Sequence, residues 1–522
     1  MSEHATEVEP SSAIENARKA SSWTLFITGT AIVLLTLLVF YPKTSVSMDE
    51  MRYMSLSRYL LNGKAYDPTS EAWFWKQLPD GKTFERTLYA PSPAFSALLT
   101  PFVAINWRSA CLLGTLAHIG AFGGLIYLMR RRGLHPAWAL LYLLHPTAVL
   151  YSRMVMADLP SAALFVLALV LLHRGRPSRF CSGLVMGAAV LLKLSNAPIV
   201  AVFGLGCLVT SLADRENRSW VSKLRGPVVM ALGMLPGLVA LVTINWVCFN
   251  SPTGNGYIGM ADGYFGWRYF VSNFPWYLGA LMLAYPFMLI APAFLGGTCR
   301  WEMRLSCVAV LLFFGAFYFH DVGNTWYESI IRGLRFQIIV MPFYIIAYAH
   351  MLTWVMKRVR WRRTVLAALV LMMVAVTAGD VLLSRKHVEV SAILHARQEE
   401  LGEVLPGNAV VVTCPMTSKY VNAVLSPELK VINLYSGGLL SKEVTEDDLP
   451  ATIVLPTPEG MVTEAHAELA RFYRENLLTS ARKSFRVHRP RQQVAGVDIV
   501  VLVEKFPSVR TEMDDSRFVM PR

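Results

Sequence analysis

Long apolar runs separated by short basic clusters constrain this 522-residue chain more than any other feature. A membrane-spanning helix needs about 20 mostly apolar residues. Because 54% of the residues are hydrophobic and only 16% are charged, a purely soluble protein is excluded. Two stretches, 134–173 and 180–213, are too long for one span each. Seven other runs fit a single span, near 22–41, 109–129, 227–249, 275–297, 305–319, 333–355 and 364–384.

The clusters of Lys and Arg indicate how many spans each of the two long stretches contains. If all the clusters face the cytoplasm, as the positive-inside rule indicates, an even number of spans separates each neighbouring pair. Both stretches then become helical hairpins, which turn near 151–160 and 193–198. The clusters hold 17 Lys and Arg against three acids, which accounts for the whole net charge of +13, so a nucleic-acid partner is not indicated. They lie at 130–132, 174–179, 214–225, 300–304 and 357–363.

The same parity predicts a polytopic α-helical protein of about eleven spans in the inner (plasma) membrane. Its N-terminal tail, 1–21, is expected in the cytoplasm, with the first apolar run retained as an anchor. The transmembrane domain is expected over 22–384, with a large first outer loop over 42–108. Within that loop, 90–105 is apolar but carries three prolines, so we expect a non-spanning juxtamembrane or re-entrant segment there.

The C-terminal region, 385–522, differs in composition from the rest of the chain. Charges return, and helical patterns alternate with short β-branched runs, which predicts a small soluble α/β domain on the periplasmic (extracytoplasmic) side. The β-branched runs are AVVVT at 409–413, KVINL at 430–434, TIVL at 452–455 and VDIVVLVEK at 497–505.

The predicted topology places several ionisable residues on the outer face. Ionisable groups at membrane depth are costly unless they are paired or line a wet cavity, so they are candidates for function. Several alternatives stay open: a local salt bridge between Arg153 and Asp158, snorkelling of Lys193, and interfacial anchoring by Arg332 and Arg335. The candidates are Asp49, Glu50, Arg153, Asp158, Lys193, Arg268, Arg332 and Arg335.

Asp49 and Glu50 stand where the first apolar run ends. The stretch after them is amphipathic and stops at Gly63, which predicts a short helix lying on the membrane. Such a helix would hold the carboxylates at the interface. A carboxylate beside several cations suits transfer from a lipid-linked phosphate, because the carboxylate takes a proton from an acceptor hydroxyl and the cations stabilise the departing phosphate.

Five segments resemble membrane glycosyltransferases of the GT-C superfamily, of the protein mannosyltransferase and aminoarabinose transferase type. The resemblance covers roughly residues 22–355 and depends on the order of the segments, because no single motif is specific. The segments are DEMRYMSLSRYLLNGKAY from Asp49, TFERTLYAPSPAFSALLTPF from Thr83, YSRMVMADLPSAALFVLAL from Tyr151, LLKLSNAPIV from Leu191 and GLRFQIIVMPF from Gly333.

The resemblance implies roles for individual residues. Asp49 would be the general base, Glu50 would support it, and Asp158 would be a second essential acid. The family's Glu-Lys-Pro-Pro segment is replaced here by Glu85-Arg86-Thr87-Leu88, which weakens the roles of Glu85 and Arg86. The donor-phosphate candidates are Glu85, Arg86, Arg153, Lys193, Arg268, Arg332 and Arg335. Two adjacent carboxylates are few for a calcium cage, so we expect no metal or other cofactor, although a divalent cation is possible.

The sequence thus predicts an inverting glycosyltransferase that uses a hexosyl or pentosyl polyprenyl-phosphate donor, such as an undecaprenyl-phosphate sugar. The acceptor would be a lipid, glycan or protein at the outer face of the cell envelope. The alternative is a transporter or flippase of lipid-linked sugar. Transporters commonly contain two related halves with sites at the bilayer midplane, whereas the charges here gather at one face.

Overall fold

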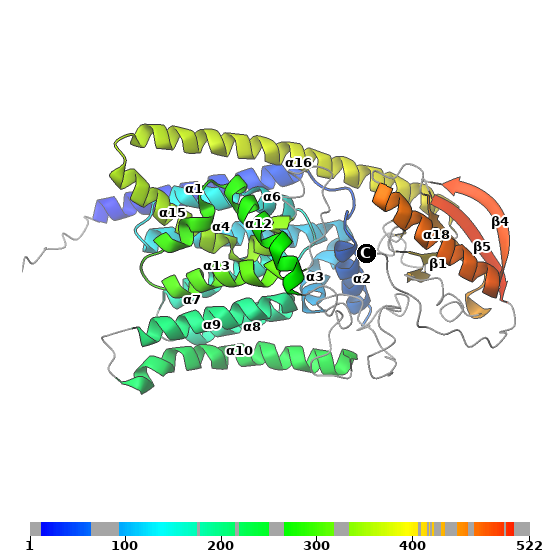
Figure 1. Ribbon diagram of the computed structural model, residues 1–522, viewed down its shortest axis with the longest axis horizontal. Helices are drawn as coiled ribbons and strands as arrows, with labels where there is room; N and C mark the ends of the chain where they lie inside the picture. Colours follow the sequence, from blue (N-terminus) through cyan, green and yellow to red (C-terminus); the bar gives the residue numbers. More distant parts are fainter. Residues whose placement is uncertain are drawn as a thin grey trace, which may run out of the picture. The chain divides into compact units, whose positions relative to one another are not determined.

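The computed structural model divides into two compact units, one ending at Ala392 and one beginning at Ile393. The first unit is helical and the second contains a β-sheet (Figure 1). The structure describes residues 12–63, 93–174, 178–213, 219–249, 266–317, 333–405, 409–414, 417, 420–421, 430–433, 446–457, 464–494 and 497–505.

The helical unit contains long helices, short helices and 3-10 turns. Its α-helices are α1 (Ser12–Val39), α2 (Met48–Leu61), α3 (Pro93–Ile105), α4 (Leu112–Arg131), α5 (Leu140–Leu143), α6 (Pro146–Tyr151), α7 (Asp158–Leu172), α8 (Ser178–Leu192), α9 (Ala197–Leu212), α10 (Trp220–Phe249), α12 (Trp267–Ala284), α13 (Arg300–Gly315), α15 (Met341–Arg358) and α16 (Arg362–Val404). The 3-10 turns are η1 (Trp107–Cys111), η2 (Pro136–Ala139), η3 (Leu194–Asn196), η4 (Met288–Phe294) and η5 (Leu334–Val340).

Six helices in the described part of the chain are long and apolar enough to cross a membrane: Ala20–Val39, Trp107–Arg131, Leu194–Leu212, Trp220–Trp246, Leu334–Arg358 and Arg362–Val404. Both predicted hairpin turns are present as helix breaks, one between α6 and α7 and one between α8 and α9. The apolar run at 364–384 is the first half of a longer helix, because α16 continues to Val404.

Two expected spans differ from the prediction. Residues 134–151, expected as the first arm of a hairpin, form η2, α5 and α6 instead of one regular helix, with Pro136 and Pro146 at the starts of new turns. The run at 275–297 is also divided, because α12 ends at Ala284 and η4 follows after Phe287, which has a φ of 66°. Proline lacks the N–H group that continues a helix, which explains why new turns begin at Pro136 and Pro146 and why the run breaks near Pro286.

Small residues bring α8 and α10 together. A Cβ atom built on Gly183 would lie 3.1 Å from the Cα atom of Gly233, and one on Gly187 would lie 3.3 Å from that of Gly237. Within each helix the two glycines are spaced i,i+4, Gly183 and Gly187 on α8 and Gly233 and Gly237 on α10. This arrangement allows membrane helices to approach closely. Figure 1 shows α8 and α10 side by side.

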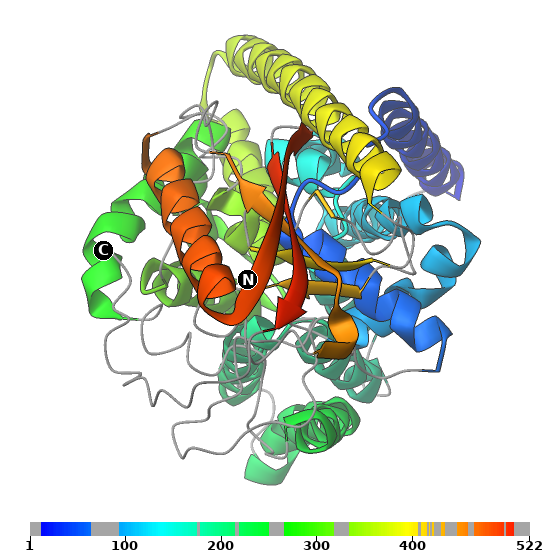
Figure 2. The same cartoon turned by 90° about the vertical axis from the view of Figure 1, so that its right-hand side faces the viewer.

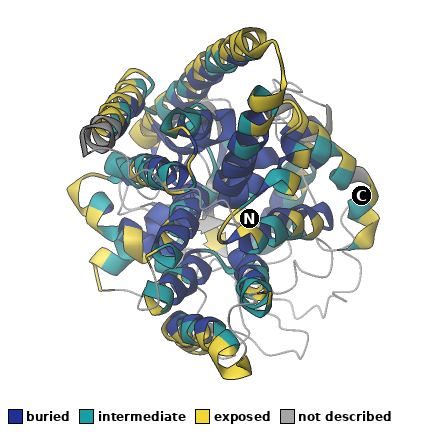
Figure 3. Cartoon of the chain, turned by 90° about the vertical axis from the view of Figure 1, so that its left-hand side faces the viewer, coloured by how far each residue is buried: buried dark blue, intermediate teal, exposed yellow. Residues whose placement is uncertain are grey.

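Buried residues gather at the centre of the helical unit, while the outer helices expose their outward sides (Figure 3). The exposed side chains on α1, α10 and α16 include large apolar ones, such as Leu38 at 73%, Val239 at 62% and Leu371 at 69%. Extended apolar exposure of this kind is typical of surfaces that face lipid.

The short helix predicted after Asp49 is α2. Ser47 caps its N-terminus, and it ends before Gly63, whose φ of 69° favours glycine. The Ser57 hydroxyl oxygen lies 2.7 Å from the carbonyl oxygens of both Tyr53 and Ser96, and a hydrogen bond to Ser96 joins α2 to α3. With thirteen residues, α3 is about 20 Å long, shorter than the bilayer core.

The second unit contains a five-stranded sheet in the order β2-β1-β3-β5-β4, with α18 (Glu464–Ser484) packed beside it (Figure 2). β1 pairs in parallel with β2 and β3, whereas β5 pairs antiparallel with β3 and β4. All four predicted β-branched runs form strands, and β4 was not predicted. The strands are β1 (Val410–Thr413), β2 (Lys430–Asn433), β3 (Ala451–Pro456), β4 (Phe485–Val494) and β5 (Val497–Lys505).

Candidate active site

The first candidate residues lie at the N-terminus of α2. The Ser47 hydroxyl accepts the backbone N–H of Glu50, and the Glu50 carboxylate accepts those of Ser47 and Val46 at 2.9 and 3.0 Å. This is a capping box. The other oxygen of Glu50 accepts the N–H of Val155 at 2.9 Å, so Glu50 also joins α2 to the segment before α7.

Glu50 and Asp49 have different environments although they are adjacent. Glu50 is 2% exposed, and burial raises the pKa of its carboxyl above the ordinary value despite the N–H donors. The side chain of Asp49 is 34% exposed. Burial alone would raise its pKa, but the charges of Arg335 and Arg52 outweigh that effect and hold the pKa below its usual range. Glu50 is therefore the buried carboxylate, bound by backbone N–H groups, and Asp49 is the more accessible one.

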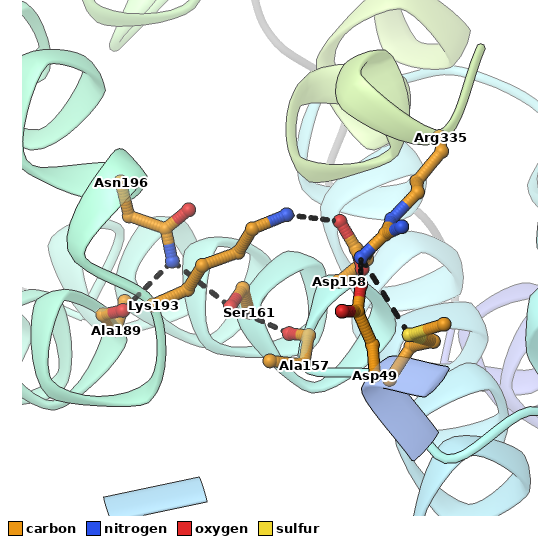
Figure 4. A network of polar contacts seen from close by, with 9 residues as sticks. Asp49, Ala157, Asp158, Ser161, Ala189, Lys193, Asn196 and Arg335 are labelled. Atoms are coloured by element: carbon orange, nitrogen blue, oxygen red, sulfur yellow. Dashed lines mark hydrogen bonds and ion pairs between the residues drawn. The ribbon is translucent and has the colours of Figure 1, made fainter. Parts of the chain in front are cut away.

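Asp158 begins α7 and meets Lys193, which follows α8. The Lys193 ammonium lies 2.5 Å from Oδ1 of Asp158. Asn196 holds the turn that carries Lys193, because its amide donates to the Ser161 hydroxyl on α7 at 2.9 Å and to the Ala189 carbonyl at 2.7 Å. The turn between α8 and α9 is thereby fixed against α7 (Figure 4).

Arg335, in the turn η5 that leads into α15, connects the two acids. Its Nη2 donates to Oδ2 of Asp49 at 3.1 Å and its Nε to Oδ2 of Asp158 at 3.3 Å (Figure 4). The rings of Phe336 and Tyr151 lie 5.8 and 6.0 Å from the guanidinium carbon. We call Asp49, Asp158, Lys193 and Arg335 the ion cluster.

The ion cluster balances two carboxylates against two cations. Asp158 is the most buried member, with 5% of its side chain exposed, against 15% for Lys193 and 22% for Arg335. Each Asp158 oxygen faces a cation, whereas one Asp49 oxygen contacts Arg335, at 3.1 Å. Within the described ranges no group of three His, Cys, Asp or Glu side chains converges.

Arg153 does not join the ion cluster. It is 2% exposed, its guanidinium donates to the Ser384 hydroxyl of α16, and it lies 5.3 Å from the Phe40 ring. The structure therefore contradicts the local salt bridge to Asp158: the turn between α6 and α7 directs the two side chains to different partners. A donor-phosphate role for Arg153 has no support from this geometry.

Arg268 is also apart from the ion cluster. It is exposed at the start of α12, donates to the Tyr269 hydroxyl at 2.6 Å and lies 4.7 Å from that ring. Glu85, Arg86 and Arg332 lie outside the described residues, so the geometry neither joins them to the cluster nor separates them from it.

Sequence reasoning missed the positioning residues. The capping box was readable from Ser47 and Glu50, spaced i,i+3. The contact of Asn196 with Ser161 spans 35 positions, which no local pattern specifies. Arg52 lowers the pKa of Asp49 through its charge. Arg52 lies in the segment that begins at Asp49, but no role was assigned to it from the sequence.

Comparison with solved structures identifies the fold. No known protein family and no curated protein matches this sequence. The chain has the fold of ArnT, an aminoarabinose transferase, which is the type of protein that the sequence resemblance named. The chain is accordingly a multi-pass membrane protein.

Two of the similar structures are those of ArnT, the aminoarabinose transferase, from Cupriavidus metallidurans. The form bound to undecaprenyl phosphate aligns with a TM-score of 0.53 at 15% identity, and the apo form with 0.54 at 13%. Each alignment covers 92% of this chain and 98% of ArnT. An oligosaccharyltransferase from Archaeoglobus fulgidus, tethered to an acceptor peptide, aligns with a TM-score of 0.45 at 11% identity, over 93% of this chain and 76% of its own.

Proposed function

We propose that this protein is an inverting glycosyltransferase that moves a sugar from a polyprenyl-phosphate carrier to an acceptor at the extracytoplasmic face of the membrane. The ion cluster is the observation that carries the proposal, because it sets one accessible carboxylate beside two cations held by a buried acid. The fold shared with ArnT, which was crystallised with undecaprenyl phosphate, supports a carrier of that class.

Asp49 is the proposed general base. As the acceptor oxygen forms its bond to the anomeric carbon, the Asp49 carboxylate takes the hydroxyl proton. The bond from that carbon to the phosphate oxygen breaks on the opposite side, so the configuration inverts and polyprenyl phosphate leaves. Glu50 supports this step by holding the N-terminus of α2 in place through its capping box.

Arg335 and Lys193 are the proposed phosphate ligands. Their charges would stabilise the phosphate as it gains negative charge on leaving, and Asp158 keeps both side chains in place. A phosphate that draws Arg335 from Asp49 would also raise the pKa of the base toward neutrality, which favours proton transfer. Roles for Glu85, Arg86, Arg268 and Arg332 rest on the resemblance alone.

We propose that transfer needs no metal, because the two cations of the ion cluster supply the positive charge that a metal would give a departing phosphate. Chelation with EDTA should leave the rate unchanged. Loss of activity that Mg²⁺ or Mn²⁺ restores would contradict this.

The proposed topology has about eleven spans, with residues 1–21 in the cytoplasm, 22–384 as the transmembrane domain and 385–522 as an extracytoplasmic α/β domain. The chain would lie in the inner membrane. A topology reporter fused after Arg522 should be active in the periplasm. A cytoplasmic signal would contradict the proposed number of spans, which assumes an even number between neighbouring basic clusters.

Mass analysis of glycolipids and surface polysaccharide in a deletion strain tests the function. We expect loss of one hexose or pentose from an acceptor and accumulation of the polyprenyl-phosphate sugar on the outer leaflet. A flippase would instead leave the same lipid on the inner leaflet. An unchanged glycan profile would overturn both candidates.

A further inference from the structure

A cavity of about 870 Å³ lies at the opposite ends of the helices that carry the ion cluster. Asp158 begins α7, and Leu172, which lines the cavity, ends it. On α8 the direction is reversed, because Arg179 lines the cavity near the start and Lys193 follows the end. Fifteen helical residues span about 22 Å, so the cavity is distinct from the ion cluster.

Two arginines from different helices line this cavity: Arg179 on α8, partly buried, and Arg225 on α10, exposed. Among the described residues, neither guanidinium has a hydrogen-bond or carboxylate partner. Arg179 lies against Gly226, where an added Cβ atom would come 1.8 Å from its Nη1. The absence of a side chain at Gly226 therefore makes room for the guanidinium at the cavity wall.

Several other polar groups of the lining have partners within the protein. The Thr210 hydroxyl donates to Glu302 at 2.9 Å, which ties that buried carboxylate of α13 to α9. The hydroxyl groups of Ser211 and Ser222 donate to the backbone carbonyls of Lys223 and Ser219. Arg179 and Arg225 are thus the cationic donors of the described lining, which also contains the Glu302 carboxylate.

The remainder of the lining is apolar, with Leu172, Val221, Pro227, Val229 and Met230 among its members. The basic clusters of the sequence lie at this same end of the helices: Arg130 and Arg131 end α4, and Arg300 begins α13. Two arginines beside an apolar wall, at the basic face of the membrane, suit a ligand with an anionic head group and a hydrocarbon tail.

We propose that this cavity binds the phosphate group of an acidic membrane phospholipid between Arg179 and Arg225, with part of its acyl chain against the apolar lining. Guanidinium groups bind phosphate oxygens with charge-assisted hydrogen bonds, and basic pockets between membrane helices hold acidic head groups. The bound lipid would brace α8 against α10 at the end remote from the ion cluster. This inference is independent of the proposed function.

The test uses the full-length protein, purified in neutral detergent and freed of lipid. Native mass spectrometry would follow the binding of phosphatidylglycerol and of phosphatidylcholine with the same acyl chains. The wild type should bind one phosphatidylglycerol more tightly than phosphatidylcholine. The double variant Arg179→Gln/Arg225→Gln should weaken phosphatidylglycerol binding about 30-fold.

Two further variants keep the test decisive. Gly226→Ala retains both charges and suits a helix, but it displaces the Arg179 guanidinium, so binding should weaken to a smaller extent. Arg358→Gln is the matched control, because Arg358 is a basic residue that ends α15, stacks 4.1 Å from Trp354 and does not line the cavity. It should bind phosphatidylglycerol like the wild type.

Three outcomes would overturn the proposal. The first is equal phosphatidylglycerol binding by the wild type, the double variant and Gly226→Ala. The second is an equal loss in Arg358→Gln, which would indicate attraction to surface charge alone. The third comes from adding inorganic phosphate without lipid. If phosphate raises the thermal stability of the wild type but not of the double variant, and phosphatidylglycerol does not, the site binds a soluble anion.

Discussion

The starts of α2 and α7 each present one aspartate to the same arginine, yet the two carboxylates differ. Asp158 at the start of α7 is 5% exposed and has a cation at each oxygen. Asp49 on α2 is 34% exposed and has one contact of 3.1 Å to Arg335. In the proposed mechanism this difference separates two tasks: Asp158 holds the cations in place, and Asp49 stays available to a substrate.

Removing the charge of Asp158 should have the largest effect, because two cations would lose their shared acid. Asp158→Asn should abolish transfer and lower the free energy of unfolding by about 3 kcal/mol. Asp49→Asn, at the more exposed site, should lower it by less than about 1 kcal/mol. Thermal unfolding in detergent compares the two variants. Equal destabilisation would remove the distinction between the carboxylates.

Substitution of Arg335 should act on donor binding. Arg335→Gln removes charged hydrogen bonds, so the dissociation constant for a polyprenyl-phosphate lipid should rise about 10- to 100-fold. Arg385→Gln is the matched control, because Arg385 is exposed on α16 and pairs with Glu389 outside the ion cluster. Lipid titration monitored by intrinsic fluorescence gives both constants. Unchanged affinity in Arg335→Gln, or the same loss in both variants, would refute the phosphate role.

A smaller effect should come from Arg52, whose charge helps to hold the pKa of Asp49 below its usual range. A general base works only when deprotonated, so kcat/KM should be constant near neutral pH and fall as the pH drops through that pKa. Arg52→Gln raises the pKa, so the acid limb of the profile should move to higher pH by about one unit or less. An acid limb that stays in place, or moves to lower pH, would contradict Asp49 as the titrating base.

The sequence predicted the ion cluster better than its surroundings. Asp49, Asp158, Lys193 and Arg335 were all selected from helix ends that the basic clusters place on one face, and all four meet in the structure. Their direct pairing was not predicted, because it joins positions as far apart as 286 residues. Topology specifies which ends share a face but not which side chains touch.

Local geometry accounts for what the sequence did not predict. Arg153 was a site candidate because the predicted topology places its turn on the outer face, yet it contacts Ser384, 231 positions away. The direction of a side chain in an irregular turn depends on dihedral angles that residue type does not fix. The broken arm over 134–151 was more predictable, since Pro136 and Pro146 mark its new turns.

The most direct test of the central claim compares donor binding and turnover in Asp49→Asn. With purified protein, a polyprenyl-phosphate sugar and the acceptor identified from the deletion strain, transfer should fall at least about 100-fold while the donor dissociation constant stays within about threefold of the wild type. That result separates a base from a phosphate ligand. Near-normal turnover in Asp49→Asn would contradict the account.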